Sequence, residues 1–256
     1  MNIALVLKQV PDLVEGLEID ASGKAVDPSS VRYILSESDD HALEEALIIK
    51  ERVGARVEVY SLDTGEAREA MITALAKGAD HAVMVNAQTE SAPDNHTAAQ
   101  IFASIFRQKQ FDLILTGVRA IDDLDGSLGG LIAGLLDLPY VGLVRKAQVE
   151  GGAAGIIVEK EYPGGCAAEL AVTPPAVLGI QAAEQPPRYV PISRLRQMMK
   201  TASVEELLVP PVSLPPMNVA RMFKPEEGAG AVMLTGSLEQ LSQQVTGLIA
   251  ERHLLR

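Results

Sequence analysis

Short apolar runs alternate with longer amphipathic segments over the first 140 residues of the chain. Residues 3–7 are continuously apolar, which is typical of strands buried on both faces of a parallel sheet. Residues 40–51 instead repeat their apolar positions at helical spacing. The same two patterns predict strands over 56–62, 81–85 and 111–116, and helices over 66–77, 95–109 and 128–136. This alternation predicts right-handed crossovers and an α/β fold with a doubly wound, mostly parallel sheet.

The pattern changes after Pro139, where strands follow one another without helices between them. Strands are predicted over 143–150, 154–161, 165–172 and 176–180, with Gly and Pro pairs at the turns. We expect these strands to add antiparallel hairpins at one edge of the sheet or beside it. A smaller hairpin is predicted over 17–26, around the turn Ser22-Gly23.

From Gln185 onward the chain is rich in proline. Helices are predicted over 192–200 and 204–207, and an amphipathic helix over 237–252. Such proline-bounded pieces are typical of an arm that packs on another surface, and the alternative is an arm that folds back on its own domain. We therefore divide the chain into an α/β core over 1–184, with antiparallel additions from about residue 140, and an extended C-terminal arm over 185–256.

Composition excludes several classes of function. The chain has 22 Lys and Arg against 34 Asp and Glu, a net charge of −12 that disfavours nucleic acid and anionic membranes as main ligands. A single cysteine, Cys166, rules out an internal disulfide, and we expect it to be an ordinary interior strand residue. The sequence has neither a run of 18 apolar residues nor a recognisable leader, so we expect a cytoplasmic protein, in a bacterium.

A loop rich in Asp and Gly lies between the predicted strand 111–116 and the predicted helix 128–136. Ligands of open α/β sheets bind outside the carboxyl ends of the strands, where glycines let backbone N–H groups approach a phosphate. The loop matches neither of the two common phosphate-binding glycine motifs. The alternative is that Gly129 and Gly130 only allow the helix to pack closely on the sheet.

Other polar residues give weaker signals. Three acids in this loop, Asp122, Asp123 and Asp125, could hold Mg²⁺, but we expect caps and helix-dipole partners. Residues 8–12 follow the first strand at the edge where a ligand would lie, although an ordinary loop is the alternative. The four histidines have no metal-ligand spacing, and no nucleophile motif is recognisable. We expect no self-sufficient catalytic site.

Several segments occur together in an order that resembles one protein family. They are V-L-K-Q-V-P-D from Val6, A-L-E-E-A-L from Ala42, T-A-L-A-K-G-A-D from Thr73, D-L-I-L-T-G-x-x-A-I-D-D from Asp112 and E-x-P-P-R-Y-V-P-I from Glu184. Over residues 1–200 the chain resembles the β subunit of electron transfer flavoproteins. The resemblance implies a Rossmann-like, adenine-nucleotide-binding core.

The resemblance also implies a function without turnover of a substrate. A β subunit of this family pairs with an α subunit whose C-terminal domain holds the redox FAD. The β subunit holds a structural AMP, or in electron-bifurcating relatives a second FAD. Electrons arrive from flavin dehydrogenases and leave to a quinone oxidoreductase or another acceptor. By this resemblance the C-terminal arm packs on the α subunit.

The resemblance assigns two sets of residues. The cofactor-binding set comprises Leu7, Lys8, Gln9, Ser36, Leu62, Gly117, Ala120, Ile121, Asp122, Asp123, Gly126, Ser127, Leu128 and Gly129. The partner-recognition set comprises Arg188, Tyr189, Ile192 and Leu195. Ile192 is expected to insert into a groove of a dehydrogenase, although an ordinary packed isoleucine is the alternative.

Two stretches depart from the family pattern. Ser36 to Ala42 replaces N-P-F/Y-D-E-x-A, and Ser127-Leu128-Gly129 replaces Gln-Thr/Val-Gly. Glu37 near phosphates is unfavourable unless it points away or caps a helix. The bound nucleotide therefore stays open between AMP, FAD and none. The alternatives from other classes are a stand-alone adenine-nucleotide hydrolase or ligase, and a homodimeric stress or sensor protein.

Overall fold

The computed structural model describes residues 1–14, 16–63, 65, 67–87, 93–123, 125–149, 155–212, 219–225 and 230–254. The predicted turn Gly151-Gly152, the pair Pro215-Pro216 and the element ends expected at 66, 150 and 154 lie outside these residues. The chain forms two compact units, Met1–Ala220 and Arg221–Arg256. Among the described helices, none is long and apolar enough to cross a membrane.

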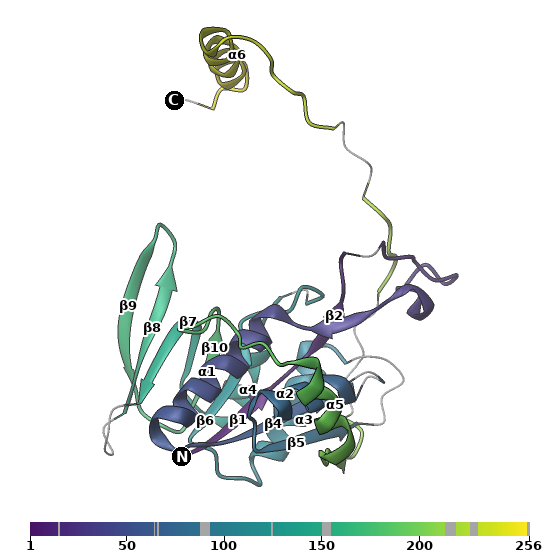
Figure 1. Cartoon of the computed structure of the whole chain (residues 1–256), viewed down its shortest axis with the longest axis vertical. Coiled ribbons are helices and arrows are strands. Elements are labelled where there is room, and N and C mark those ends of the chain that lie inside the picture. The colour runs from purple at the N-terminus through teal and green to yellow at the C-terminus, as the bar shows by residue number, and fades with distance from the viewer. Residues whose placement is uncertain are drawn as a thin grey trace. The chain divides into compact units, whose positions relative to one another are not determined.

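A mostly parallel sheet forms the centre of the first unit (Figure 1). Parallel strands lie in the order β11 (Glu205–Leu208), β5 (His81–Asn86), β4 (Arg56–Leu62), β1 (Asn2–Val6), β6 (Leu113–Gly117), β10 (Ala176–Ile180) and β7 (Tyr140–Val149). The antiparallel strands β8 (Ile156–Tyr162) and β9 (Cys166–Val172) follow at the β7 end. The predicted doubly wound α/β fold with added antiparallel strands is confirmed.

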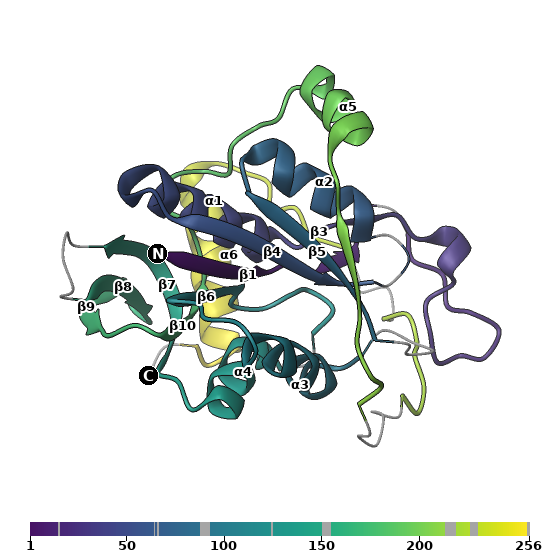
Figure 2. The same cartoon turned by 90° about the horizontal axis from the view of Figure 1, so that it is seen from below.

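Helices cover both faces of this sheet, as Figure 2 shows. The helices α1 (Glu37–Val53) and α2 (Ala67–Lys77) cover one face, and α3 (Asn95–Phe106) and α4 (Leu128–Leu136) cover the other. Strand β1 explains the arrangement, because Ile3 and Leu5 pack into the first layer while Ala4 and Val6 pack into the second. The continuous apolar run is buried on both sides, as its pattern predicts.

The small elements complete the first unit. Strands β2 (Gln9–Pro11) and β3 (Tyr33–Leu35) form a separate antiparallel pair, and η1 (Pro28–Ser30) precedes β3. An isolated bridge between Ile19 and Val26 confirms the predicted small hairpin. These elements lie along the chain between β1 and α1, so they bring the start of α1 back to the end of β1.

Three expectations for the later part of the chain are wrong. Residues 176–180 form no edge hairpin, because the wholly apolar β10 is buried between β6 and β7. Residues 204–207 form no helix, because this short segment pairs with β5 as β11 and buries Val204 beside it. Cys166 is exposed rather than interior, because β9 is the last strand of the sheet.

Much of the proline-rich region folds back on the first unit. The helix α5 (Ile192–Thr201) packs Leu195 and Met198 against the core, and β11 then joins the sheet. In the second unit, α6 (Leu238–Glu251) confirms the predicted amphipathic helix and begins with a capping box formed by Ser237 and Gln240. The functional division of the chain at residue 185 stays a prediction.

Candidate functional site

The order of the strands places a candidate ligand position between β1 and β6. From β1 the chain runs through α1 to β4 on one side, and β6 lies on the other side. Ligands of open α/β sheets bind where the strand order reverses in this way, outside the carboxyl ends of the strands. Lys8 follows β1 and Gly117 ends β6, so two residues of the predicted set flank this position.

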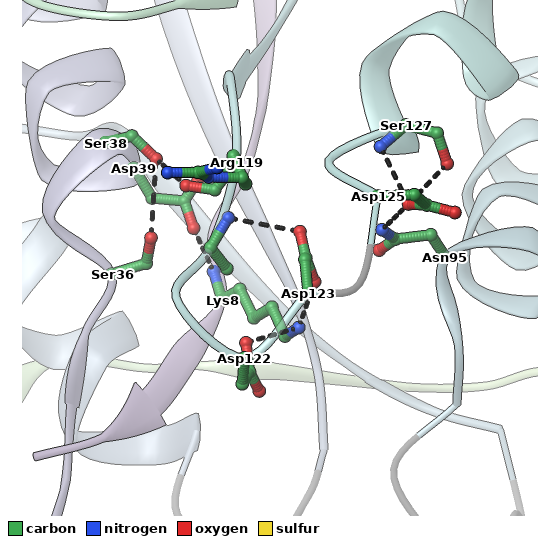
Figure 3. A network of polar contacts seen from close by, with 11 residues as sticks. Lys8, Ser36, Ser38, Asp39, Asn95, Arg119, Asp122, Asp123, Asp125 and Ser127 are labelled. Carbon is green, nitrogen blue, oxygen red and sulfur yellow. Dashed lines mark hydrogen bonds and ion pairs between the residues drawn. The ribbon is translucent and has the colours of Figure 1, made fainter. Parts of the chain in front are cut away.

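Asp39, in the first turn of α1, joins the two strand ends. Its carboxylate accepts a hydrogen bond from the backbone N–H of Lys8 at 2.9 Å (Figure 3). It accepts another from the backbone N–H of Gly117 at 2.8 Å. Burial raises the pKa of Asp39 to about 7, against these two N–H groups, which favour the charged form. The Asp39 carboxylate therefore occupies the position between the two strand ends where an anionic ligand group would accept these N–H groups.

The Lys8 side chain lies between two carboxylates of the loop after β6 (Figure 3). Its Nζ is 2.8 Å from Asp122 Oδ1 and 2.5 Å from Asp123 Oδ1. The other oxygen of Asp123 accepts from the Ala120 N–H at 3.1 Å. Partial burial lowers the pKa of Lys8, but its hydrogen bonds and attraction to Asp122 and Asp123 outweigh that effect and raise it. The expected cap role of these two acids is wrong, because both pair with the Lys8 side chain from the loop after β1.

A second polar group lies at the start of α4. Asp125 Oδ1 accepts from the backbone N–H of Ser127 at 3.0 Å, from its hydroxyl at 2.8 Å and from Asn95 at 2.8 Å. These hydrogen bonds lower the pKa of Asp125. Ser127 is the N-cap of α4 without a side-chain cap bond. Among the described residues no side chain caps the first N–H groups of α4, so they remain available to an acceptor outside the helix.

Gly129 brings α4 close to the sheet. A Cβ at Gly129 would lie 2.7 Å from Thr116 Oγ1 and 3.0 Å from Tyr140 Cε2, whereas one at Gly130 would lie 3.6 Å from its nearest neighbour. The close packing that the Gly129-Gly130 pair predicts is thus confirmed for Gly129. Nearby, Gly126 has a φ of +59°, which favours glycine.

We expect Gly129→Ala to lower the free energy of unfolding by about 1–3 kcal/mol, because Thr116 and Tyr140 have to move. Gly130→Ala is the matched control and should be neutral or stabilising by up to about 1 kcal/mol, since alanine favours helix and meets only ordinary contacts. Urea unfolding of both variants measures the difference. Equal stability of the two variants would contradict the packing argument.

The other predicted cofactor residues occupy varied environments. Leu7 is buried, Ser36 is the N-cap of α1 and donates its N–H to the Lys8 carbonyl, and Ile121 is exposed. Leu62 ends β4, and Leu128 begins α4, each half-buried against the second helix layer. Glu37 opens α1 as an acid in its first turn. The structure therefore gathers most of the set at the carboxyl edge of β1, β4 and β6.

The sequence assignment missed several polar groups at this edge. Asp39 and Ser38, whose hydroxyl donates to the Arg119 carbonyl at 2.6 Å, stand just before the predicted helix 40–51, where Ser and Asp are common as caps, and the sequence gives no other signal for them. Thr116 Oγ1 and Gln9 Oε1 are buried without a hydrogen-bond partner among the described residues. Buried polar atoms without partners are rare and costly, so these two atoms point to a missing ligand or water.

The segment before α5 is held by side chains of α1. Glu44 accepts from the Arg188 backbone N–H at 2.9 Å and forms a two-pronged ion pair with its guanidinium. Glu45 accepts from the N–H groups of Ala147 and Glu184, and burial raises its pKa. Burial also opposes the charge on Glu44, but Arg188 outweighs it and lowers the pKa. Arg188 therefore fixes its own segment to α1.

We expect Glu44→Ala to lower the free energy of unfolding by about 2–3 kcal/mol, because the guanidinium and the backbone N–H of Arg188 lose their acceptor. Glu51→Ala is the control: Glu51 also pairs with Arg188 but is 62% exposed against 4% for Glu44, so its loss should cost less than about 1 kcal/mol. Because its pKa is lowered, the Glu44 contribution is present above pH 4.5 and is lost on acidification. Thermal unfolding at pH 7 and pH 3 tests both statements.

The remaining predicted recognition residues point in different directions. Tyr189 and Ile192 are exposed, and Ile192 is the first residue of α5, as expected. Leu195 instead packs against the core. Within the described residues, no group of acids, histidines or cysteines is arranged to hold a metal ion.

Comparisons with known proteins give the family that this chain resembles in sequence. The family model described as electron transfer flavoprotein domain matches residues 24–212. The electron transfer flavoprotein subunit beta of Methylophilus methylotrophus is 31% identical, with 98% of each chain covered. That of Thermoanaerobacterium thermosaccharolyticum is 30% identical over 100% of both chains. The caffeyl-CoA reductase-Etf complex subunit CarD of Acetobacterium woodii is 29% identical, also over 100% of both.

Proposed function

Because the chain belongs to the electron transfer flavoprotein family and is similar to its β subunits over its whole length, we propose that it is the β subunit of a heterodimeric electron carrier. In this proposal the α subunit holds or shares the FAD that carries the electrons. Flavin dehydrogenases supply them, and a quinone oxidoreductase or another acceptor receives them, in the bacterial cytoplasm. The chain itself turns over no substrate.

The observation that carries the nucleotide part of this proposal is the group of polar atoms at the carboxyl ends of β1 and β6 and at the start of α4. The free N–H groups at the start of α4, the close approach at Gly129 and the unpartnered Thr116 Oγ1 and Gln9 Oε1 fit an adenine nucleotide. The phosphate belongs at α4, because Asp39 already accepts the N–H groups of Lys8 and Gly117.

Charge favours a short phosphate chain over a long one. Asp122 and Asp123 neutralise Lys8, so this cation is not free to bind phosphates. An AMP therefore suits this edge better than a triphosphate, and a second FAD is the other family ligand. The bound nucleotide supplies packing and rigidity between β1 and β6, where the strand order reverses. The redox chemistry belongs to the FAD of the α subunit.

The chain's own residues have positioning roles in this proposal. Asp39 and Lys8 fix the loops that surround the nucleotide. Arg188 and Glu44 fix the segment that leads into α5, and Tyr189 and Ile192 are presented to the donor. A few exposed apolar side chains suit the transient contacts of an electron carrier.

The test is to express the chain together with its α subunit, denature the complex, and identify the released molecules by mass spectrometry and visible spectrum. One FAD and one AMP per heterodimer are expected, with less AMP in Gly129→Ala than in Gly130→Ala. Two FAD per heterodimer would mean that the nucleotide site of this chain holds a second FAD instead of AMP. FAD without AMP would overturn its nucleotide part, and a chain that captures no flavin-bearing partner would overturn the proposal itself.

A further inference from the structure

His81, the first residue of β5, lies between carboxylates of the two strands that flank it. Its Nε2 is 3.1 Å from Glu205 Oε2 on β11, and its Nδ1 is 3.9 Å from Glu58 Oε2 on β4. Nδ1 is buried and has no hydrogen-bond partner among the described residues. A neutral imidazole carries one N–H and can donate to only one carboxylate, whereas a protonated imidazole donates from both nitrogens. The arrangement therefore suits the protonated form better.

The three side chains lie on the face of the sheet that α3 and α4 cover. The residue two positions further along each of the three strands packs into this layer: Val83, Tyr60 and Leu207. Because the side chains of a strand alternate between the two faces, His81, Glu58 and Glu205 lie on the same side. Asp80, which precedes His81, pairs instead with Lys50 of α1, on the opposite face.

Three further polar groups on this side act on Glu58. The Lys109 Nζ is 3.2 Å from its Oε2, Arg56 Nε is 3.3 Å from its Oε1, and the Tyr60 hydroxyl donates to Oε2 at 2.8 Å. These groups belong to β4 and to the segment after α3, so none of them moves with β11. Glu205 is therefore the carboxylate whose attraction for His81 depends on the place of β11.

Strand β11 is well placed to open locally. It has four residues, lies at one end of the sheet and pairs with β5. Short edge strands with few buried contacts separate from a sheet at a small cost in free energy. When β11 separates from β5, Glu205 leaves His81. Since β11 is the last strand before the second unit, this opening also releases the chain that leads to that unit.

We propose that proton binding by His81 holds β11 to the sheet. The protonated imidazole gains an attraction to Glu205 that exists only while β11 is paired, so proton uptake and strand pairing favour each other. Acid therefore favours the paired state. β11 opens more often as pH rises through the range of about pH 5–8 in which histidines lose their proton. This control by pH goes beyond the proposed function and does not depend on it.

The test is hydrogen–deuterium exchange of the full-length chain, as purified, with mass spectrometry of peptides that cover β11. Protection factors, which correct for the intrinsic effect of pH on exchange, are compared at pH 5.5 and pH 8.0. The wild type is expected to protect β11 about 3–5-fold more at pH 5.5. His81→Gln and Glu205→Gln should each remove this difference. Glu206→Gln is the matched control and should keep it, because Glu206 lies on β11 but pairs with Arg68 of α2.

Each contrary result would overturn the inference. Equal wild-type protection at the two pH values would do so, and so would a pH difference that survives in His81→Gln, because another group would then be responsible. Equal losses in Glu205→Gln and Glu206→Gln would show that the total charge of β11 explains the effect. Peptides that cover β1 and β6 report whether each variant is folded, and the half-exposed Glu205 keeps the test open if His81→Gln does not fold.

Discussion

Asp39→Ala is expected to lower the free energy of unfolding by about 3–6 kcal/mol, one of the two largest effects that we predict. The substitution leaves the partly buried backbone N–H groups of Lys8 and Gly117 without an acceptor, at the junction of β1 and β6. Each such orphan costs about 1–3 kcal/mol, and removal of a buried side chain adds to the loss. Glu37→Ala is the control, because Glu37 lies in the same first turn of α1 but is exposed.

The titration of Asp39 gives the same prediction a pH dependence. Its folded-state pKa of about 7 lies above the ordinary value of 3.8, so the folded state binds this proton more tightly than the unfolded state. Stability from this group is therefore complete below pH 3.8 and is lost as pH rises through about 7, by up to about 4 kcal/mol.

Asp39→Asn separates the hydrogen bond from the titration. Its amide oxygen still accepts one N–H, so the variant should lose less stability than Asp39→Ala and lack the decline between pH 4 and pH 7 that Asp39 contributes. Urea unfolding of wild type, Asp39→Ala, Asp39→Asn and Glu37→Ala at several pH values measures both effects. If Asp39→Ala matches Glu37→Ala in stability, the carboxylate bridge is not what holds the two strand ends.

Removal of residues 221–256 is expected to weaken pairing with the α subunit at least about 100-fold, or about 2.7 kcal/mol, while the first unit stays folded. Helix α6 has no buried residue and exposes Leu238, Val245 and Leu248. A helix of 14 residues is marginal in water even with its capping box, so it needs a partner surface. Each aliphatic side chain that it buries contributes about 1.5–3 kcal/mol, which is enough for the predicted effect.

The site of truncation matters for this test. Truncation after Thr201 would remove β11 together with the buried Val204 and Val209, so it would damage the core as well. Truncation after Ala220 keeps these residues. Leu248→Asp should weaken pairing in the full chain, whereas Gln243→Asp, also on α6 and exposed, should not. Full-strength pairing of chain 1–220, measured by sedimentation or calorimetry, would show that the second unit is not needed for the heterodimer.

The sequence by itself determined most of the longer elements and the class of the fold. The alternation of strands and helices up to residue 136, the change to consecutive strands after Pro139, the start of α5 at Ile192 and the amphipathic α6 all follow from patterns within a few residues. Burial of every second side chain in β1 on each face is likewise a local property of an apolar strand. The resemblance to electron transfer flavoprotein β subunits pointed to the carboxyl edge of β1 and β6, because two of its motifs, V-L-K-Q-V-P-D and D-L-I-L-T-G-x-x-A-I-D-D, run across the ends of these strands.

Only the tertiary structure decided which side chains meet. Asp39 reaches Lys8 across 31 positions and Gly117 across 78, Lys8 reaches Asp123 across 115, and Glu44 reaches Arg188 across 144. Local periodicity gives no information about such pairs, because they depend on the order of the strands and on which helix covers which face. The same reason explains β10 and β11, whose places in the sheet are fixed by the neighbours that bury them rather than by their own residues.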